Sequence, residues 1–214
     1  MKLYRKTHKS EAQVVLFING QFPEKMPLLD GFEKIYCTDG AYTKLLESGI
    51  QPDLVSGDFD SLAVSEINAE TKIIETPDQN ATDFEKILRI IIEDGFKSVA
   101  VYGCSGLEQD HFLGNLNSML KHKDEIEIRC FDDFGFYFFA EKNIEIIDFQ
   151  DEIISLFPFP EAKNIYSEGV KYPLNGEDLS ITTRIGTRNM ITSEKVHLKF
   201  TSGNLLVFVQ SKQA

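Results

Sequence analysis

Residues 14–131 alternate between short continuous apolar runs and amphipathic stretches with helical spacing. Apolar runs of this kind are typical of strands that are buried on both faces. Alternating strands and helices predict a mostly parallel sheet with helices on both faces, which is here a Rossmann-like α/β domain. The expected strands are residues 14–18, 34–38, 54–56, 72–75, 98–102 and 126–131, and the expected helices are 41–48, 82–94 and 110–122.

The pattern changes near residue 135, where helical periodicity disappears. Turn signals such as Pro158-Phe159-Pro160 and Asn175-Gly176 separate a series of short β-prone runs. These runs are residues 137–139, 144–147, 153–157, 163–166, 179–183, 196–200 and 205–209. We therefore predict an α/β domain over residues 1–140, followed by an antiparallel β-sandwich domain over residues 141–214.

The formal charge of −12 argues against a broad cationic surface that would bind nucleic acid or an anionic membrane. The three cysteines, Cys37, Cys104 and Cys130, are far apart and odd in number, which argues against a disulfide framework. We see no signal peptide and no apolar run that is long enough to span a membrane. A cytoplasmic protein with reduced thiols, and with neither nucleic acid nor membrane as a partner, is the expectation.

Two aspartates, Asp58 and Asp60, follow the apolar run Leu54-Val55 and a glycine. This pattern predicts a buried strand that breaks into a loop, where both carboxylates can reach a common point. Oxygen ligands of this kind suit Mg²⁺, which binds through one or two carboxylates and shares its other positions with water and phosphate. The alternative is a turn in which Asp60 or Ser61 caps the next helix. This stretch alone leaves both interpretations open.

Polar residues also end the other predicted strands. In open sheets of this type, ligands bind at the carboxyl ends of the strands, so these residues are expected to converge on one edge. No GxxxxGK[ST] motif is present, and no GxGxxG motif follows the first strand. The candidates are therefore the polar residues themselves, namely Asn19, Asp39, Asp58, Asp60, Asp78, Asp83 and Asp110.

Several motifs along residues 14–209 resemble those of thiamine pyrophosphokinases in their order and spacing. The combination is specific, although each motif alone is weak. The motifs are Asp39-Gly40-Ala41, Gly57-Asp58-Phe59-Asp60-Ser61-Leu62, Thr82-Asp83, Gly103-Cys104-Ser105-Gly106, Asp110-His111, Ser155-Leu156-Phe157-Pro158, Gly169-Val170-Lys171-Tyr172-Pro173-Leu174 and Gly186-Thr187-Arg188-Asn189.

The resemblance implies a homodimer whose site lies between the α/β domain of one subunit and the β-sandwich of its partner. It also implies a Mg²⁺-dependent transfer of pyrophosphate from ATP to the hydroxyl of thiamine, with release of AMP. A cation would be needed there, because three phosphates beside many carboxylates would otherwise repel them.

The resemblance assigns roles to particular residues. It implies that Asp58, Asp60 and Asp83 are metal ligands and that these three and Asp110 are catalytic. Which carboxylate accepts the hydroxyl proton stays open. The residues expected to contact substrate or nucleotide are Asn19, Asp39, Gln79, Thr82 and Asp110 in the first domain and Lys171, Arg184, Thr187, Arg188 and Asn189 in the second.

The chain departs from the family pattern at Glu108, where the family commonly carries arginine. An arginine would bind polyphosphate through two hydrogen bonds, whereas a glutamate would repel it. Either cations of the second domain supply the charge or activity is reduced, and we favour the first. These cations are Lys171, Arg184 and Arg188, although the family often has a small hydroxyl residue at position 188. With no tryptophan in the chain, Tyr166 and Tyr172 are the candidates for stacking on thiamine.

Parts of the sequence are also consistent with two other functions. A haloacid-dehalogenase-like phosphatase is suggested by Asp58-Phe59-Asp60-Ser61-Leu62, which approximates its nucleophile motif, with Asp132-Asp133 as a later acidic pair. Against it, the motif does not follow the first strand and the β-rich second half has no explanation. The other alternative is a non-catalytic thiamine or nucleotide sensor, in which Glu108 marks a lost activity.

Overall fold

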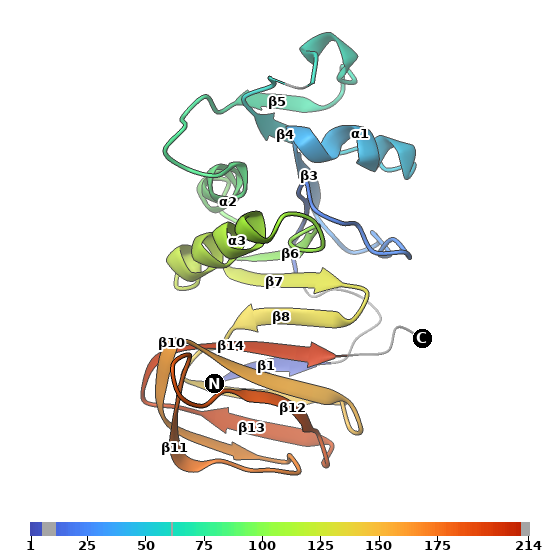
Figure 1. The fold of residues 1–214 in the computed structure, drawn as a ribbon. Helices are drawn as coiled ribbons and strands as arrows, with labels where there is room; N and C mark the ends of the chain where they lie inside the picture. The colour runs from blue at the N-terminus through green and yellow to red at the C-terminus, as the bar shows by residue number, and fades with distance from the viewer. Residues whose placement is uncertain (6–11, 61, 211–214) are drawn as a thin grey trace. The chain divides into compact units, whose positions relative to one another are not determined.

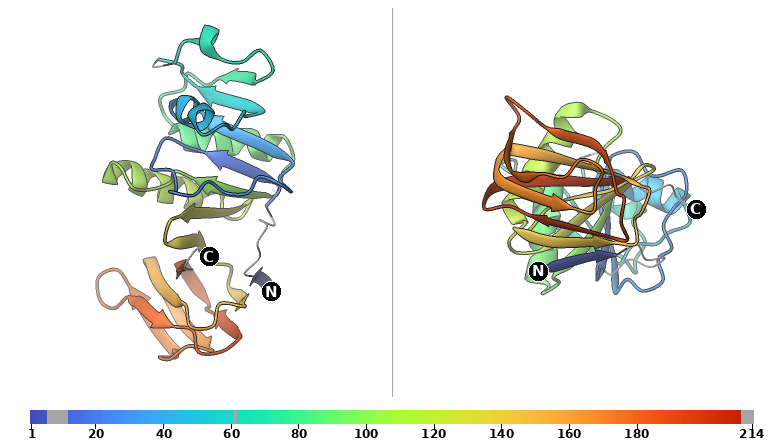
Figure 2. Two further views of the ribbon diagram at one scale, coloured as in Figure 1. Left: turned by 90° about the vertical axis from the view of Figure 1, so that its right-hand side faces the viewer. Right: turned by 90° about the horizontal axis from the view of Figure 1, so that it is seen from below.

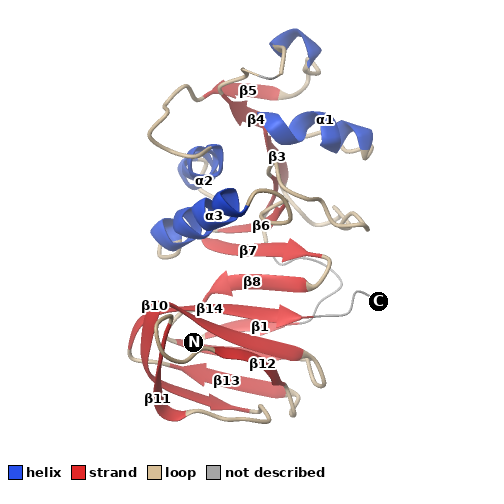
Figure 3. Ribbon diagram, viewed as in Figure 1, coloured by secondary structure: helices blue, strands red, loops and turns tan. Residues whose placement is uncertain are grey.

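The computed structural model describes residues 1–5, 12–60 and 62–210. The chain divides into two compact units (Figure 1 and Figure 2). The N-terminal unit comprises residues 9–133, and the C-terminal unit combines residues 1–8 with residues 134–214. In the described part of the chain, all helices belong to the N-terminal unit, and the C-terminal unit consists of strands and loops (Figure 3).

A parallel sheet forms the centre of the N-terminal unit, and its strands lie where the apolar runs predicted them. The strand order is β7-β6-β2-β3-β4-β5, and every pairing within it is parallel. The strands are β2 (Val14–Phe17), β3 (Lys34–Thr38), β4 (Leu54–Gly57), β5 (Lys72–Glu75), β6 (Ser98–Tyr102) and β7 (Glu127–Asp132).

Helices cover both faces of this sheet (Figure 1). Buried residues of α1 (Asp39–Glu47) pack into a core with alternate residues of β2, β3 and β4. On the other face, α2 (Asp83–Glu93) contacts β3, β4 and α3 (Gln109–His122). A short 3₁₀ helix, η1 (Val64–Glu66), precedes β5. None of the helices in the described ranges is long and apolar enough to cross a membrane.

The strand order reverses between β2 and β6, because β3 to β5 extend to one side of β2 and β6 and β7 extend to the other. In open α/β sheets such a reversal opens a crevice at the carboxyl ends of the strands. Here the two loops at the reversal are in close contact. A Cβ atom on Gly20 would lie 1.9 Å from the carbonyl oxygen of Gly103, and Gln21 N donates to Ser105 O at 2.8 Å. Glycine is therefore required at the close approach between these loops.

The C-terminal unit contains antiparallel strands around the long strand β10 (Ile153–Glu168), which pairs with β11, β12, β13 and β14. Strand β14 also pairs with β8, and β13 pairs with β9. The remaining strands are β1 (Lys2–Arg5), β8 (Gly135–Phe139), β9 (Asn143–Ile147), β11 (Asn175–Ser180), β12 (Gly186–Met190), β13 (Lys195–Lys199) and β14 (Ser202–Gln210).

The C-terminal unit differs from the sequence expectation in three strands. The expected turn at Pro158-Phe159-Pro160 lies inside β10, where the pairing with β14 shifts register between Pro158 and Ala162. Proline lacks an amide hydrogen, and the irregular register accommodates it without ending the strand. Asn175-Gly176 begins β11 instead of forming a turn between strands. Strand β12 was not predicted, because its sequence is polar and largely exposed.

The division between the units differs from the expected boundary at residue 140. It falls after Asp133, because Gly135–Phe139 is strand β8 and pairs with β14 of the C-terminal unit. The first residues of the chain also differ from the expectation. Lys2–Arg5 form β1, which pairs with β9 in parallel, so this segment belongs to the C-terminal unit.

Candidate functional site

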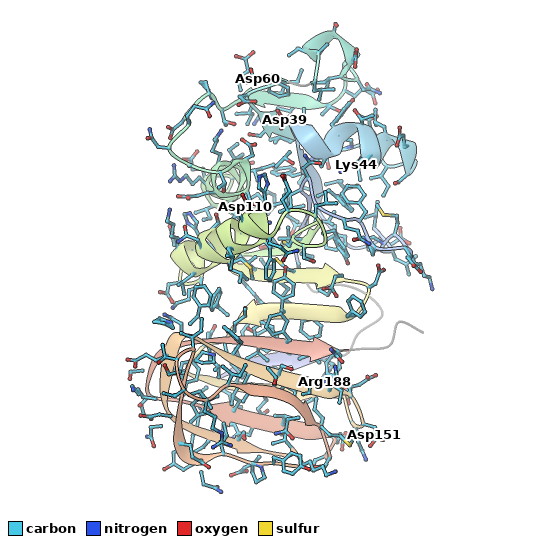
Figure 4. All side chains as sticks on the ribbon, in the orientation of Figure 1. Asp39, Lys44, Asp60, Asp110, Asp151 and Arg188 are labelled. Carbon is cyan, nitrogen blue, oxygen red and sulfur yellow. The ribbon has the colours of Figure 1, made fainter. Side chains whose placement is uncertain are left out.

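The carboxyl ends of β3, β4 and β5 bring three predicted site residues close together. Asp39 follows β3 as the first residue of α1, Asp58 follows β4, and Asp83 begins α2 after the β5 loop. Figure 4 labels Asp39 and Asp60 near β4 and β5, and Asp110 on α3. The N-terminal unit therefore has an acidic edge, which we define by Asp39, Asp58 and Asp83.

Asp39 is buried, and both of its carboxylate oxygens accept backbone hydrogen bonds. Oδ1 accepts from Gly40 N at 2.7 Å, and Oδ2 accepts from Phe59 N at 3.0 Å. Burial raises the pKa of Asp39, and the charges of Asp83 and Asp58 raise it further, against the effect of the two backbone donors. Asp39 therefore supports the turn after β4, in which Phe59 has the left-handed φ of +58°.

Asp58 is partly buried, and its carboxylate is oriented by two hydrogen bonds. Oδ1 accepts from Asp60 N at 3.3 Å, and Oδ2 accepts from Gln79 Nε2 at 3.2 Å. These bonds, first that from Asp60 and then that from Gln79, lower the pKa of Asp58. Gln79, which was predicted to orient nucleotide, here orients a site carboxylate. Asp58 is therefore held ionised and facing solvent.

The turn interpretation of this loop is confirmed only in part. Asp58 accepts the amide hydrogen of Asp60, so a side-chain-supported turn does form. The expected cap does not, because Ala63 is the N-cap of η1 and no side chain caps that helix. Ser61, the other candidate cap, lies outside the described residues.

Asp83 lies at the start of α2 beside a lysine that the sequence analysis missed. Lys86 Nζ lies 2.8 Å from Asp83 Oδ1 and donates to Thr76 O at 2.8 Å. Thr82 is the N-cap of α2, where its hydroxyl accepts from Glu85 N at 3.2 Å. The spacing of an aspartate and a lysine three positions apart on one helix was the available signal for this ion pair.

Asn19 lies in the loop after β2, and Asp110 lies at the start of α3, which follows β6. Asn19 Oδ1 accepts from Lys44 Nζ at 2.9 Å, which adds a second cation that the sequence analysis missed. Asp110 is exposed at the start of α3, where Oδ1 accepts from His111 N at 3.0 Å. Within the described residues, Asp110 forms no hydrogen bond or ion pair with the acidic edge.

Glu108, the position that departs from the family pattern, precedes α3 as its N-cap residue. Its side chain makes no capping hydrogen bond and lies 3.7 Å from His111 Nε2, with both side chains about three-quarters exposed. Glu108 is therefore a solvated carboxylate at the end of the helix.

The predicted site residues of the C-terminal unit lie on or beside β12. Asn189 accepts from Tyr172 N at 3.1 Å and donates to Tyr172 O at 2.8 Å, so its amide links β12 to the loop between β10 and β11. Arg188 has the left-handed φ of +57°, and its backbone N donates to Ser155 Oγ at 2.9 Å. The side chains of Arg184 and Arg188 are exposed, and within the described ranges neither forms an ion pair. Thr187 is also exposed, and Lys171 Nζ lies 5.5 Å from the centre of the Tyr172 ring.

The donor chemistry of the acidic edge fits Mg²⁺, although no preformed cluster is present. Across the described residues, no group of three or more His, Cys, Asp or Glu side chains is arranged to hold a metal ion. Mg²⁺ does not require such a cluster, because it retains water and binds through one or two carboxylates and substrate phosphates. Asp58, held ionised and only partly buried, offers the kind of oxygen ligand that Mg²⁺ prefers.

Comparison with known proteins matches this chain to one family. Residues 27–130 match the family described as thiamin pyrophosphokinase, catalytic domain, and residues 143–205 match the thiamin pyrophosphokinase, vitamin B1 binding domain. Thiamin pyrophosphokinase 1 of Caenorhabditis elegans is 24% identical over 97% of this chain and 93% of its own length. Thiamine pyrophosphokinase of Bacillus subtilis is 28% identical over 81% of this chain and 85% of its own length.

Solved structures agree with this assignment at the level of the fold. The crystal structure of the Bacillus subtilis thiamine pyrophosphokinase has a TM-score of 0.79 and 23% identity, and covers 94% of this chain and 100% of its own. That of Candida albicans thiamin pyrophosphokinase has a TM-score of 0.80 and 17% identity, with 98% and 92% covered. These matches do not favour the phosphatase or the sensor. Because the two family matches together span most of the sequence, the chain belongs to the thiamin pyrophosphokinase family.

Proposed function

We propose that this chain transfers pyrophosphate from ATP to the hydroxyl of thiamine in a Mg²⁺-dependent reaction that releases AMP. The observation that carries the proposal is the acidic edge at the carboxyl ends of adjacent parallel strands, in a chain of this family. The bound cation would neutralise the polyphosphate as charge develops on it. Asp58, Asp60 and Asp83 would hold the cation, with Asp58 kept ionised for this role by Asp60 N and Gln79.

Among the remaining carboxylates, Asp110 is the better candidate to accept the hydroxyl proton of thiamine. Asp39 is buried, and each of its oxygens already accepts a backbone hydrogen bond. Asp110 is exposed, and only Oδ1 is engaged, by the backbone of its own helix. A free carboxylate oxygen can act as a general base once substrate lies within hydrogen-bonding reach.

The finer architecture belongs to the same proposal. We propose a Rossmann-like domain that binds ATP, a β-sandwich domain that binds thiamine, and a cytoplasmic homodimer with its site between subunits. Exposed Arg184 and Arg188 support a role for the second domain in charge neutralisation, because neither side chain is paired within the described residues. Asn189 would act by holding the chain at Tyr172, and Thr187 would face substrate.

One incubation tests the reaction. The protein is mixed with ATP, Mg²⁺ and thiamine, and the nucleotides are separated by chromatography. We expect AMP and pyrophosphorylated thiamine in equal amounts, and neither product when thiamine is omitted or EDTA is added. ADP as the product, or nucleotide hydrolysis that does not depend on thiamine, would contradict the proposal. Release of inorganic phosphate from simple phosphate esters would instead support the phosphatase.

The charge contributed by the second domain is tested with Arg184→Ala and Arg188→Ala. Removing a cation that contacts phosphate costs about 2 kcal/mol of binding, so we expect at least one variant to raise the KM for ATP by about 30-fold. Steady-state kinetics with thiamine at saturation measures this change. An unchanged KM in both variants would leave Lys171 as the remaining compensating cation named above.

Glu108→Arg restores the residue type that the family commonly carries. Because Glu108 is exposed and makes no capping bond, we expect the variant to fold normally. Exchanging a repulsive charge for a bidentate donor near polyphosphate should lower the KM for ATP by about three- to tenfold. Glu108→Gln, which removes the charge alone, should give a smaller decrease. An unchanged KM in both Glu108→Arg and Glu108→Gln would mean that this position lies away from the nucleotide.

A further inference from the structure

A buried lysine lies directly behind the acidic edge. The side chain of Lys86 is 7% exposed, and its ammonium group contacts Asp83 Oδ1 and Thr76 O, each at 2.8 Å. Lysine is rarely buried unless its charge is paired. The other buried basic residues of the described chain are Arg129 on β7, which bonds to Glu127, and His122 on α3, whose Nδ1 lies 2.8 Å from Glu125 Oε1. Among the described residues, Lys86 is thus the one buried lysine or arginine next to the predicted metal ligands.

The contacts of Lys86 reach both neighbouring segments of the site. Thr76, whose carbonyl it binds, donates its own N–H to Gly57 O at 2.8 Å, immediately before Asp58. Thr76 also begins the loop that carries Gln79, and Gln79 binds Asp58 Oδ2 at 3.2 Å. One ammonium group therefore fixes Asp83 and the origin of the loop that orients Asp58.

The ion pair with Lys86 also determines which oxygen of Asp83 stays available. Lys86 engages Oδ1, whereas the Asp83 side chain as a whole is 44% exposed. A partner that holds one oxygen of a carboxylate presents the other in a fixed direction. Such outer partners of metal ligands typically change metal affinity or activity by about 10- to 100-fold when they are removed.

We infer that Lys86 is a positioning residue, which presents Asp83 and the loop 76–80 to the cation and the polyphosphate without touching either. The inference rests on the proposed role of Asp83 in the reaction. The positive charge of Lys86, which acts on Asp58 and Asp78 as well, keeps several carboxylates together before substrate arrives. Lysine is suited to this position because its three donors can serve a carboxylate and a carbonyl at once.

Lys86→Met tests the inference, because methionine keeps most of the side-chain volume and removes the ammonium. Removing one partner of a buried ion pair is destabilising when the other charge stays buried, but the Asp83 side chain is 44% exposed and water can solvate its carboxylate. We expect kcat/KM to fall about 30-fold and Mn²⁺ affinity, measured by electron paramagnetic resonance without nucleotide, to fall about tenfold. Lys72→Met, at an exposed lysine of β5, is the matched control and should change neither.

Hydrogen exchange separates positioning from general destabilisation. In Lys86→Met the amides of residues 76–82 should exchange at least about fivefold faster, while those of β2 and β6 keep their wild-type rates. In a double-mutant cycle, Asp83→Asn with Lys86→Met should be no more than about threefold less active than Asp83→Asn alone. Lys86→Arg should recover part of the lost activity.

Three results would overturn the inference. These are independent, multiplicative losses in the double variant, unchanged exchange at residues 76–82, or an unchanged kcat/KM in Lys86→Met. A failure of the proposed function would look different, because wild-type protein would then release no AMP. In that case the exchange rates would still decide whether Lys86 holds the loop in place.

Discussion

Asp58→Asn is expected to abolish most turnover while leaving the fold intact. The amide keeps one oxygen that can accept from Asp60 N or Gln79, so the local turn survives. It removes the negative charge that the proposed cation requires. We expect kcat/KM to fall by about 10³-fold, as for other groups that act on developing charge. Asp60→Asn should behave in the same way.

Stability measurements distinguish this result from a damaged fold. Because Asp58 is only partly buried and asparagine keeps an accepting oxygen there, the thermal midpoint should move by no more than about 2 °C. Asp151→Asn in the C-terminal unit is a suitable control, since Asp151 is exposed with the left-handed φ of +68°, which asparagine also adopts. It should retain full activity. A collapse of the midpoint in Asp58→Asn, with activity lost in proportion to unfolded protein, would assign the loop a structural role instead.

The local pattern of the sequence predicted the α/β part well because each element there is determined by its own residues. The apolar run of β2 is continuous, and α2 has a capping threonine and an apolar face. The C-terminal unit was harder to predict because pairing partners decide its strands. Strand β10 continues through two prolines because β14 pairs with it both before and after the Pro158–Pro160 segment. Lys2–Arg5 form a strand because β9 pairs with them.

The roles of individual site residues depended on contacts that the sequence does not encode locally. Asp39 and Asp58 both follow strands, and nothing in their own segments indicates that Asp39 is buried whereas Asp58 is only partly buried. The turn after β4 brings Phe59 N within hydrogen-bonding distance of Asp39 Oδ2, and this contact between separate segments covers Asp39. Lys86 was missed because a lysine on a helix is usually solvated, and its burial arises from the neighbouring Thr76 carbonyl.

Gly57→Ala is expected to damage stability and activity together. A Cβ atom on Gly57 would lie 2.1 Å from Cγ of Asp39 and 2.3 Å from its Oδ2. Asp39 cannot yield without losing its bonds to Gly40 N and Phe59 N, and Gly57 lies within the fully buried strand β4. Overpacking and a lost hydrogen bond together should lower the free energy of unfolding by about 2–4 kcal/mol.

Activity should fall further than this loss of stability explains. Asp39 supports the turn at Phe59 that separates Asp58 from Asp60, so displacing it reorients both predicted ligands at once. We expect kcat/KM to fall about 100-fold in the fraction of protein that stays folded. Urea unfolding and steady-state kinetics on the same samples give both quantities.

Gly114→Ala is the matched control, because it makes the same change in the interior of α3. A Cβ atom there meets only Thr82 Cγ2, at 3.9 Å, which is an ordinary contact. Alanine in place of glycine inside a helix should raise the free energy of unfolding by about 0.5–1 kcal/mol and leave kcat/KM unchanged. If Gly57→Ala matched this control, the close approach of Asp39 to β4 would not be what orients Asp58 and Asp60. The two glycines thus separate the effect of an added methyl group from the effect of moving Asp39.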